Sequence, residues 1–151
     1  MKDRKSIGKL ISIIYRYSNI YFQKEFMEYN LGYGQISVLM YVAYKEAATL
    51  KSITKCLKLD KGTTSFLVSK LESNKYIFRK KNQSDKREYN IFITEKAKKI
   101  IPKIKQARKE WTELLLSDFS EEEKLMAFNF LERMKNNVEY LKKKTESNEK
   151  K

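Results

Sequence analysis

A helical stripe followed at once by two short strands constrains the fold of this chain more than any other feature. The stripe's members recur at the i, i+3, i+4 and i+7 positions of one helix face: Thr64, Leu67, Val68 and Leu71. β-Branched and aromatic residues at 76–79 and 89–93 then favour two strands around a polar loop. A shorter helix is predicted upstream, at about 51–57. Two helices, a turn and a hairpin in this order predict a winged helix-turn-helix.

The predicted helix from Lys61 carries a polar, basic face opposite its apolar stripe. Asp60 stands at the N-cap position, where a carboxylate accepts from the free amides of the first turn. The polar face suits contact with base edges and phosphates in a major groove. Its members are Lys61, Thr63, Ser65, Ser69 and Lys70. A merely solvated helix face is the alternative interpretation of this set.

The loop at 80–88 forms the tip of the predicted wing and is rich in basic residues. An arginine at the end of a hairpin can enter a minor groove, and Arg87 is the candidate. Asp85 is the informative exception, because a carboxylate so close to Arg87 repels phosphate. We interpret Asp85 as a brace that holds the Arg87 guanidinium in one orientation.

Positive charge is concentrated in the same stretch. The 151-residue chain has a formal net charge of +14. Half of that excess falls between Lys51 and Lys96, which hold 12 basic and 5 acidic residues. This balance predicts duplex DNA as the partner rather than a membrane, since no apolar run reaches the length of a spanning helix. A lysine-rich proteome is the alternative explanation of the overall charge.

The sequence lacks the usual groups of catalytic and metal sites. It contains no His and one Cys, which excludes an internal disulfide framework and removes the commonest general base and metal ligand. No nucleophile–base pair and no glycine-rich phosphate loop is found. We therefore predict no enzyme activity, no cofactor and no metal. Without a leader-like apolar segment we predict a cytoplasmic protein.

Long amphipathic helices are predicted on both sides of the basic stretch. Apolar residues cover more than one face of 6–29, which suggests contact with a second subunit as well as with the same domain. A buried helix is predicted at 35–45. Residues 47–50 form a connector that can add a short third strand to the wing.

Capping residues set the predicted starts of the last two helices. Thr94 caps a helix that runs to about Leu116, with a kink expected at Pro102. Ser120 and Glu123 form a capping box for a helix that ends at about Leu141. The predicted organisation is one mainly α domain, with a DNA-binding lobe at about 31–95, dimerisation helices at 6–29 and 96–141, and a polar, frayed tail at 142–151.

Short motifs spread over the chain together resemble the MarR-type transcriptional regulators. They are Leu31-Gly32-x-x-Gln35-Ile36-x-Val38-Leu39, Asp60-Lys61-x-Thr63, Leu67-Val68-x-Lys70-Leu71-Glu72, Asp85-Lys86-Arg87 and Ile91-x-Ile93-Thr94-Glu95-Lys96. The resemblance extends, more weakly, over residues 7–141. It implies that the helix from Lys61 reads the major groove, that Arg87 enters the minor groove and that the terminal helices form a homodimer.

Four positions depart from that family. Phe66 stands where an arginine is common in the reading helix, and Gly62 where a serine is common. Phe66 can contact a thymine methyl group or pack against the neighbouring helix, and the sequence leaves both open. Lys58 and Lys75 stand where glycine is common, so a positive φ there would carry strain or be relieved by the neighbouring Asn74.

The predicted site residues fall into two groups. The DNA-binding set is Lys51, Ser52, Lys61, Gly62, Thr63, Ser65, Phe66, Ser69, Lys70, Lys81, Lys86 and Arg87. The second set is Tyr15, Tyr33, Tyr41 and Trp111, which can line a pocket for a small aromatic ligand of the kind that relatives accept. Packing in the core is the alternative for these aromatic residues.

We therefore predict a homodimeric, sequence-specific transcription regulator, a repressor, that binds a pseudo-palindromic operator and can be released by a small ligand. One alternative is a winged-helix module that binds another protein. Salt dependence distinguishes the two, because the affinity for DNA should fall steeply as the salt concentration rises. Another is a redox-sensing regulator that uses Cys56. A lone cysteine is more often a small, partly buried apolar residue, and we interpret Cys56 in that way.

Overall fold

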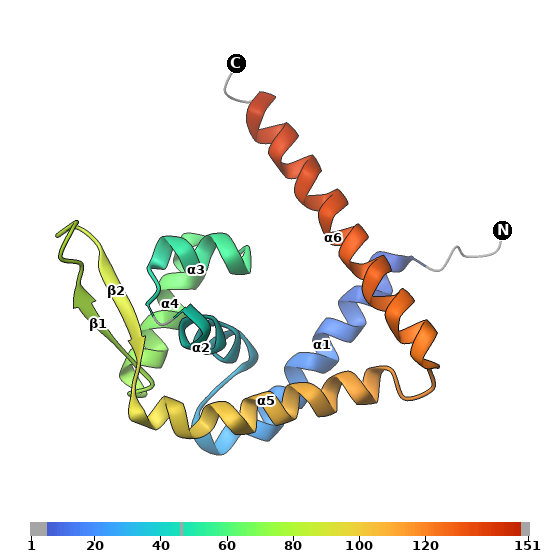
Figure 1. The fold of residues 1–151 in the computed structure, drawn as a ribbon, viewed down its shortest axis with the longest axis horizontal. Helices are drawn as coiled ribbons and strands as arrows, with labels where there is room; N and C mark the ends of the chain where they lie inside the picture. Colours follow the sequence, from blue (N-terminus) through green and yellow to red (C-terminus); the bar gives the residue numbers. More distant parts are fainter. Residues whose placement is uncertain (1–5, 46, 149–151) are drawn as a thin grey trace. The chain divides into compact units, whose positions relative to one another are not determined.

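The computed structural model describes residues 6–45 and 47–148, which form helices and one two-stranded antiparallel sheet. The chain divides into two compact units, Met1–Trp111 and Thr112–Lys151. In chain order the elements are α1 (Ile7–Phe26), η1 (Met27–Tyr29), α2 (Tyr33–Lys45), α3 (Leu50–Leu57), α4 (Lys61–Ser73), β1 (Ile77–Lys81), β2 (Tyr89–Ile93), α5 (Glu95–Leu115) and α6 (Glu121–Asn148) (Figure 1). The predicted mainly α winged fold is confirmed.

The first unit is held together by a core to which every helix of that unit and both strands contribute. The helical stripe predicted for α4 faces this core, with Val68 and Leu71 buried and Leu67 packed at its edge. Helix α2 approaches α4 closely, because a Cβ atom added to Gly34 would lie only 3.2 Å from the Leu67 side chain. The largest fully buried side chains are Phe22, Phe26, Ile36, Leu39, Ile53, Leu71, Tyr76, Ile77, Ile91 and Ile104.

The predicted helix caps are confirmed. The Thr63 N–H donates to Asp60 Oδ1 over 2.8 Å at the start of α4, and the Ala97 N–H donates to Thr94 Oγ1 over 3.2 Å at the start of α5. In the capping box of α6, the Ser120 N–H donates to Glu123 Oε2 over 2.8 Å. Each bond satisfies a first-turn or N-cap amide that has no partner within the helix.

Strands β1 and β2 form the wing, with Ile77 opposite Ile93 and Lys81 opposite Tyr89. The predicted first strand is shifted, because it begins at Ile77 and continues to Lys81, where the sequence indicated loop. Ladder hydrogen bonds with β2 outweigh the weak strand preference of consecutive lysines. The expected third strand is a single bridge between Ala48 and Ile91, whose amides and carbonyls bond at 3.1 and 2.7 Å.

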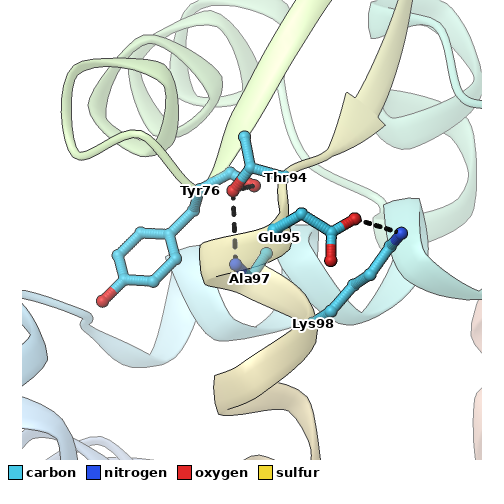
Figure 2. A network of polar contacts seen from close by, with 5 residues as sticks. All are labelled: Tyr76, Thr94, Glu95, Ala97 and Lys98. Carbon is cyan, nitrogen blue, oxygen red and sulfur yellow. Dashed lines mark hydrogen bonds and ion pairs between the residues drawn. The ribbon is translucent and has the colours of Figure 1, made fainter.

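The turn between β2 and α5 is fixed by Thr94 (Figure 2). Its hydroxyl lies 2.7 Å from the Lys75 carbonyl, to which it donates, and also caps the Ala97 amide. Lys98 and Glu95 form an ion pair on the first turn of the helix. One side chain therefore ties the residue before the wing to the helix after it.

Helix α5 is continuous from Glu95 to Leu115, with Pro102 inside it. In the second unit, α6 extends to Asn148, beyond Lys142 where the sequence predicted a frayed end. Residues 149–151 of the predicted tail lie outside the described residues. Apolar side chains remain exposed along α6: Leu125, Met126, Phe128, Phe130, Leu131, Met134, Val138, Tyr140 and Leu141.

Candidate nucleic-acid interface

Helix α4 presents the predicted reading face to solvent. Thr64, Val68 and Leu71 are buried on its other side, so the helix is anchored through one face only. The exposed side carries Lys61, Gly62, Thr63, Phe66, Ser69 and Lys70, with Ser65 half-buried beside them. The structure therefore brings together all the α4 residues that the sequence predicts for DNA contact.

The N-terminus of α4 carries a fixed negative charge. The Thr63 hydroxyl donates to Asp60 Oδ2 over 2.6 Å and the Thr63 amide donates to Asp60 Oδ1, and these bonds hold the pKa of Asp60 below its usual range. Because the folded-state pKa is lowered, the stabilisation is present above the unfolded-state pKa and is lost as pH falls through the folded value. Asp60 is therefore ionised at neutral pH and complements the helix dipole.

Helix α3 contributes one exposed cation and one engaged hydroxyl from the predicted set. Lys51 is exposed in the first turn of α3. Ser52 belongs to a capping box with Thr49, in which its hydroxyl accepts from the Thr49 amide over 3.0 Å and lies 2.9 Å from the Thr49 carbonyl. The Ser52 hydroxyl thus orients the start of α3 rather than projecting freely.

Three non-glycine residues within the described ranges have positive φ: Asn30 at 53°, Lys58 at 56° and Lys75 at 61°. Lys58 ends α3, and Lys75 lies between α4 and the wing. These are the two positions at which the family pattern indicated glycine, so the backbone has kept that conformation. The side chain of Asn74 is bonded to the Asn30 carbonyl instead of relieving Lys75.

The wing tip is ordered by two short polar side chains. Asn82 Oδ1 accepts from the amides of Ser84 and Asp85. Asp85 Oδ1 accepts from the backbone N–H of Arg87 over 2.9 Å. The predicted brace is therefore corrected: the carboxylate contacts the backbone of Arg87 and not the guanidinium, since a side chain that bonds two residues ahead closes a turn of its own.

Lys86 and Arg87 are exposed at this tip. Lys81 is also exposed, but it lies at the end of β1 and not in the loop where the sequence indicated it. Its position in the strand is set by pairing with Tyr89.

A cationic groove of about 630 Å³ lies between α3, the start of α4 and the wing. Five cations and one carboxylate line it together with apolar residues: Lys51, Lys55, Lys61, Arg79, Arg87 and Glu88, with Thr49, Leu50, Thr54, Tyr89 and Ile91. We call this the cationic groove. Lys55 and Arg79 were missing from the predicted DNA-binding set. The i, i+4 spacing of Lys51 and Lys55 on one helix face was the available signal for Lys55.

Arg79 links the wing to the reading helix. Its Nε lies 3.1 Å from Glu72 Oε2, and an Nη donates to Ser69 Oγ over 3.4 Å. Both partners are on α4, whereas Arg79 is on β1. The guanidinium therefore fixes the wing relative to α4, a tertiary contact that no local pattern predicts.

The aromatic residues predicted to line a ligand pocket make packing contacts within the first unit. The Tyr33 ring lies 5.1 Å from that of Phe22 and 5.9 Å from that of Tyr15, and Trp111 lies 5.1 Å from Tyr21. Tyr33, Tyr41 and Trp111 pack against the core, and Tyr15 is exposed. The cationic groove and a second groove beside α4 do not include any of the four.

Cys56 is exposed on α3, so its expected partial burial is wrong. On the short helix α3, Ile53 fills the core-facing position. In the described ranges, no cluster of three His, Cys, Asp or Glu side chains is suited to a metal ion. None of the described helices is both long and apolar enough to cross a bilayer.

Comparisons with known proteins agree with this geometry. The family model described as "Transcriptional regulator SarA/Rot" matches residues 21–104. The chain is similar to the crystal structure of a MarR transcriptional regulator from Methanosarcina mazei Go1, with 40% identity, a TM-score of 0.83, and coverage of 89% of this chain and 97% of that one. The chain belongs to the MarR family.

Two further similarities span nearly the whole of this MarR-family chain. A MarR protein from Peptoclostridium difficile DA00132 has 28% identity and a TM-score of 0.88, with coverage of 93% of this chain and 92% of that one. The HTH-type transcriptional regulator YybA of Bacillus subtilis (strain 168) is 29% identical over 143 residues, which are 92% of this chain and 93% of YybA. The predicted resemblance is confirmed, and this MarR-family chain is a DNA-binding transcriptional regulator.

Proposed function

We propose that this chain is a homodimeric repressor that binds a pseudo-palindromic operator through α4 and the wing, in the cytoplasm. The observation that carries the proposal is the cationic groove, which five basic residues and one acidic residue from α3, α4 and the wing help to line. Phosphodiester strands are the natural partners of such a surface, because cations that neutralise phosphates release counterions. The exposed face of α4 beside the groove supplies short polar groups for base edges.

The proposed dimer rests on the terminal helices. Helix α1 exposes Ile7, Leu10, Ile11, Ile14, Tyr17 and Ile20, although it also packs Phe22 and Phe26 into the core. Helix α6 exposes a longer apolar set of its own. Exposed apolar surface of this extent marks an interface, and members of the MarR family act as dimers. Two-fold symmetry would set two reading helices about one helical turn of DNA apart.

Release by a small ligand is part of the proposal. Tyr15 and Tyr33 meet edge to face, and Tyr15 is exposed, so an aromatic ligand could pack against the Tyr15 ring. A ligand that favours a dimer with wrongly spaced reading helices would shift the population away from DNA. Trp111 is the only tryptophan, and we expect its fluorescence to respond to small aromatic acids only if they bind near α1 and α5.

Selection of bound fragments from genomic DNA with the purified chain tests the operator. The expected result is a set of fragments that share two inverted half-sites. A reporter driven by a selected promoter should be repressed when the chain is expressed. Fragments without a common half-site, or a reporter that is activated, would contradict sequence-specific repression.

A further inference from the structure

Phe66 stands at the centre of the solvent-facing side of α4. The buried stripe of Thr64, Val68 and Leu71 defines the inner side, and Phe66 lies almost directly opposite it around the helix. Its side chain is 60% exposed, and Phe66 also borders a groove that residues of α1, η1 and α2 line with it.

Two neighbours of Phe66 on its own side of the helix are small. Gly62, one turn earlier on the same side, has no side chain, and an added Cβ there would lie 3.2 Å from Asp60 Oδ1. Ser69 follows on the same side and carries only a hydroxymethyl group. A single aromatic ring therefore projects from the middle of a face that is otherwise short and polar.

One cation lies close to the ring, and a second stands on the first turn of the same helix. Lys70 Nζ lies 5.7 Å from the centre of the Phe66 ring, and Lys61 is exposed at the start of the same helix. A partner for this face must therefore combine negative charge at the edges with an apolar group at the centre. The major groove of duplex DNA has this combination, because phosphates flank it and the thymine 5-methyl group is its apolar feature.

We infer that Phe66 is a specificity-determining residue that recognises the 5-methyl group of a thymine in each half-site. The inference rests on the proposed DNA binding by α4. The contact is a van der Waals one, so it distinguishes thymine from cytosine by the methyl group rather than by hydrogen bonds. Covering this methyl group removes apolar surface of both the ring and the base from water.

A different occupant would use the second groove, of about 460 Å³, which Phe66 itself helps to line. Its other lining residues come from α1, η1, α2, α4 and the segments beside them, among them Gln23, Met27, Gln35, Lys70 and Asn74. A ligand or protein anchored there by Phe66 would not depend on thymine methyl groups. The dependence of binding on thymine methyl groups therefore distinguishes contact with DNA from binding of a ligand or protein in the second groove.

The test uses deoxyuridine, which lacks only the methyl group of thymine. A duplex is first selected from a random library with the purified full-length chain, and each symmetric pair of thymines is then replaced by deoxyuridine. At one symmetric pair of thymines, we expect the replacement to lower the affinity of the wild-type chain by about threefold to fivefold for each methyl group removed. Phe66→Ala should bind the thymine and deoxyuridine duplexes equally, and Phe66→Arg should select guanine at that position.

Matched controls make the result decisive. Tyr44, on α2, is 81% exposed, and Tyr44→Ala should keep the full deoxyuridine effect. Phe66→Leu, which preserves an apolar side chain, should keep part of the deoxyuridine effect. Unfolding curves check that each variant is folded. Wild-type binding that ignores deoxyuridine at every position, or an effect that persists in Phe66→Ala, would overturn this inference while leaving DNA binding intact. A wild-type chain that selects no duplex would overturn the proposed function and this inference together.

Discussion

Asp85 shows how a single acidic residue can serve a basic wing. Its carboxylate accepts from the Arg87 amide and so closes a turn at the tip. The turn limits the directions from which the Arg87 side chain leaves the backbone. An oxygen acceptor is needed for this bond, whereas a negative charge is not.

Two substitutions of Asp85 separate the backbone contact from a charge effect. We expect Asp85→Asn to bind DNA at least as tightly as the wild type, because the amide oxygen keeps the acceptor and the repulsion of phosphate is removed. Asp85→Ala should weaken binding, since the turn is lost. Fluorescence anisotropy with a selected duplex measures both. Equal weakening by the two variants would instead indicate that the charge itself orients the Arg87 guanidinium.

Lys75 carries backbone strain that a glycine would not. Its φ of 61° lies in the left-handed region, where a Cβ atom is crowded. We predict that Lys75→Gly raises the free energy of unfolding by about 0.5–1 kcal/mol. Lys99→Gly, at an exposed position inside α5, is the matched control and should lower it by about 1 kcal/mol. Urea unfolding curves of both variants measure these changes. A lower free energy of unfolding in Lys75→Gly would show that the backbone at Lys75 is not strained.

At the scale of the elements, α3 and α4 are joined by two threonines. The Thr54 and Thr64 hydroxyl oxygens lie 2.9 Å apart, and Thr64 also donates to the Asp60 carbonyl over 2.9 Å. Thr64 is fully buried, so this polar link lies inside an apolar packing layer. It holds the reading helix against the helix that precedes it.

We predict that Thr64→Val lowers the free energy of unfolding by about 1 kcal/mol, because the shape is kept and only hydrogen bonds are lost. Thr54 keeps a partner in the Leu50 carbonyl, so no buried donor is stranded. Calorimetry should show a melting temperature lower by roughly 2–4 °C. A variant as stable as the wild type would show that the threonine link contributes nothing.

The sequence predicts elements well where the deciding contacts are local. The caps at Asp60, Thr94 and Ser120 follow from bonds between residues three apart, and these are confirmed. The end of β1 at Lys81 is set by pairing across the hairpin, which overrides local preference. The cationic groove and the contact of Arg79 with α4 join different elements, so helix or strand periodicity within one element does not indicate how they meet.

At the scale of the whole molecule, the apolar face of α6 carries the proposed dimer. We predict that Leu131→Glu weakens dimerisation by about a hundredfold or more, because symmetry removes two buried leucines from the interface. Asn136→Glu, an exposed position around the same helix, is the control and should remain dimeric. Light scattering at several concentrations measures both. A dimer unaffected by Leu131→Glu would exclude this face from the interface.

Salt dependence of DNA binding tests the central claim most directly. Anisotropy titrations of a selected duplex at increasing salt should give a log–log slope on the order of −5 to −9, as expected for several neutralised phosphates per dimer. Lys55→Gln should make the slope shallower by about two, one contact per subunit, whereas Lys99→Gln should leave it unchanged. A wild-type affinity that does not fall with salt, or a slope that Lys55→Gln leaves unchanged, would contradict the account.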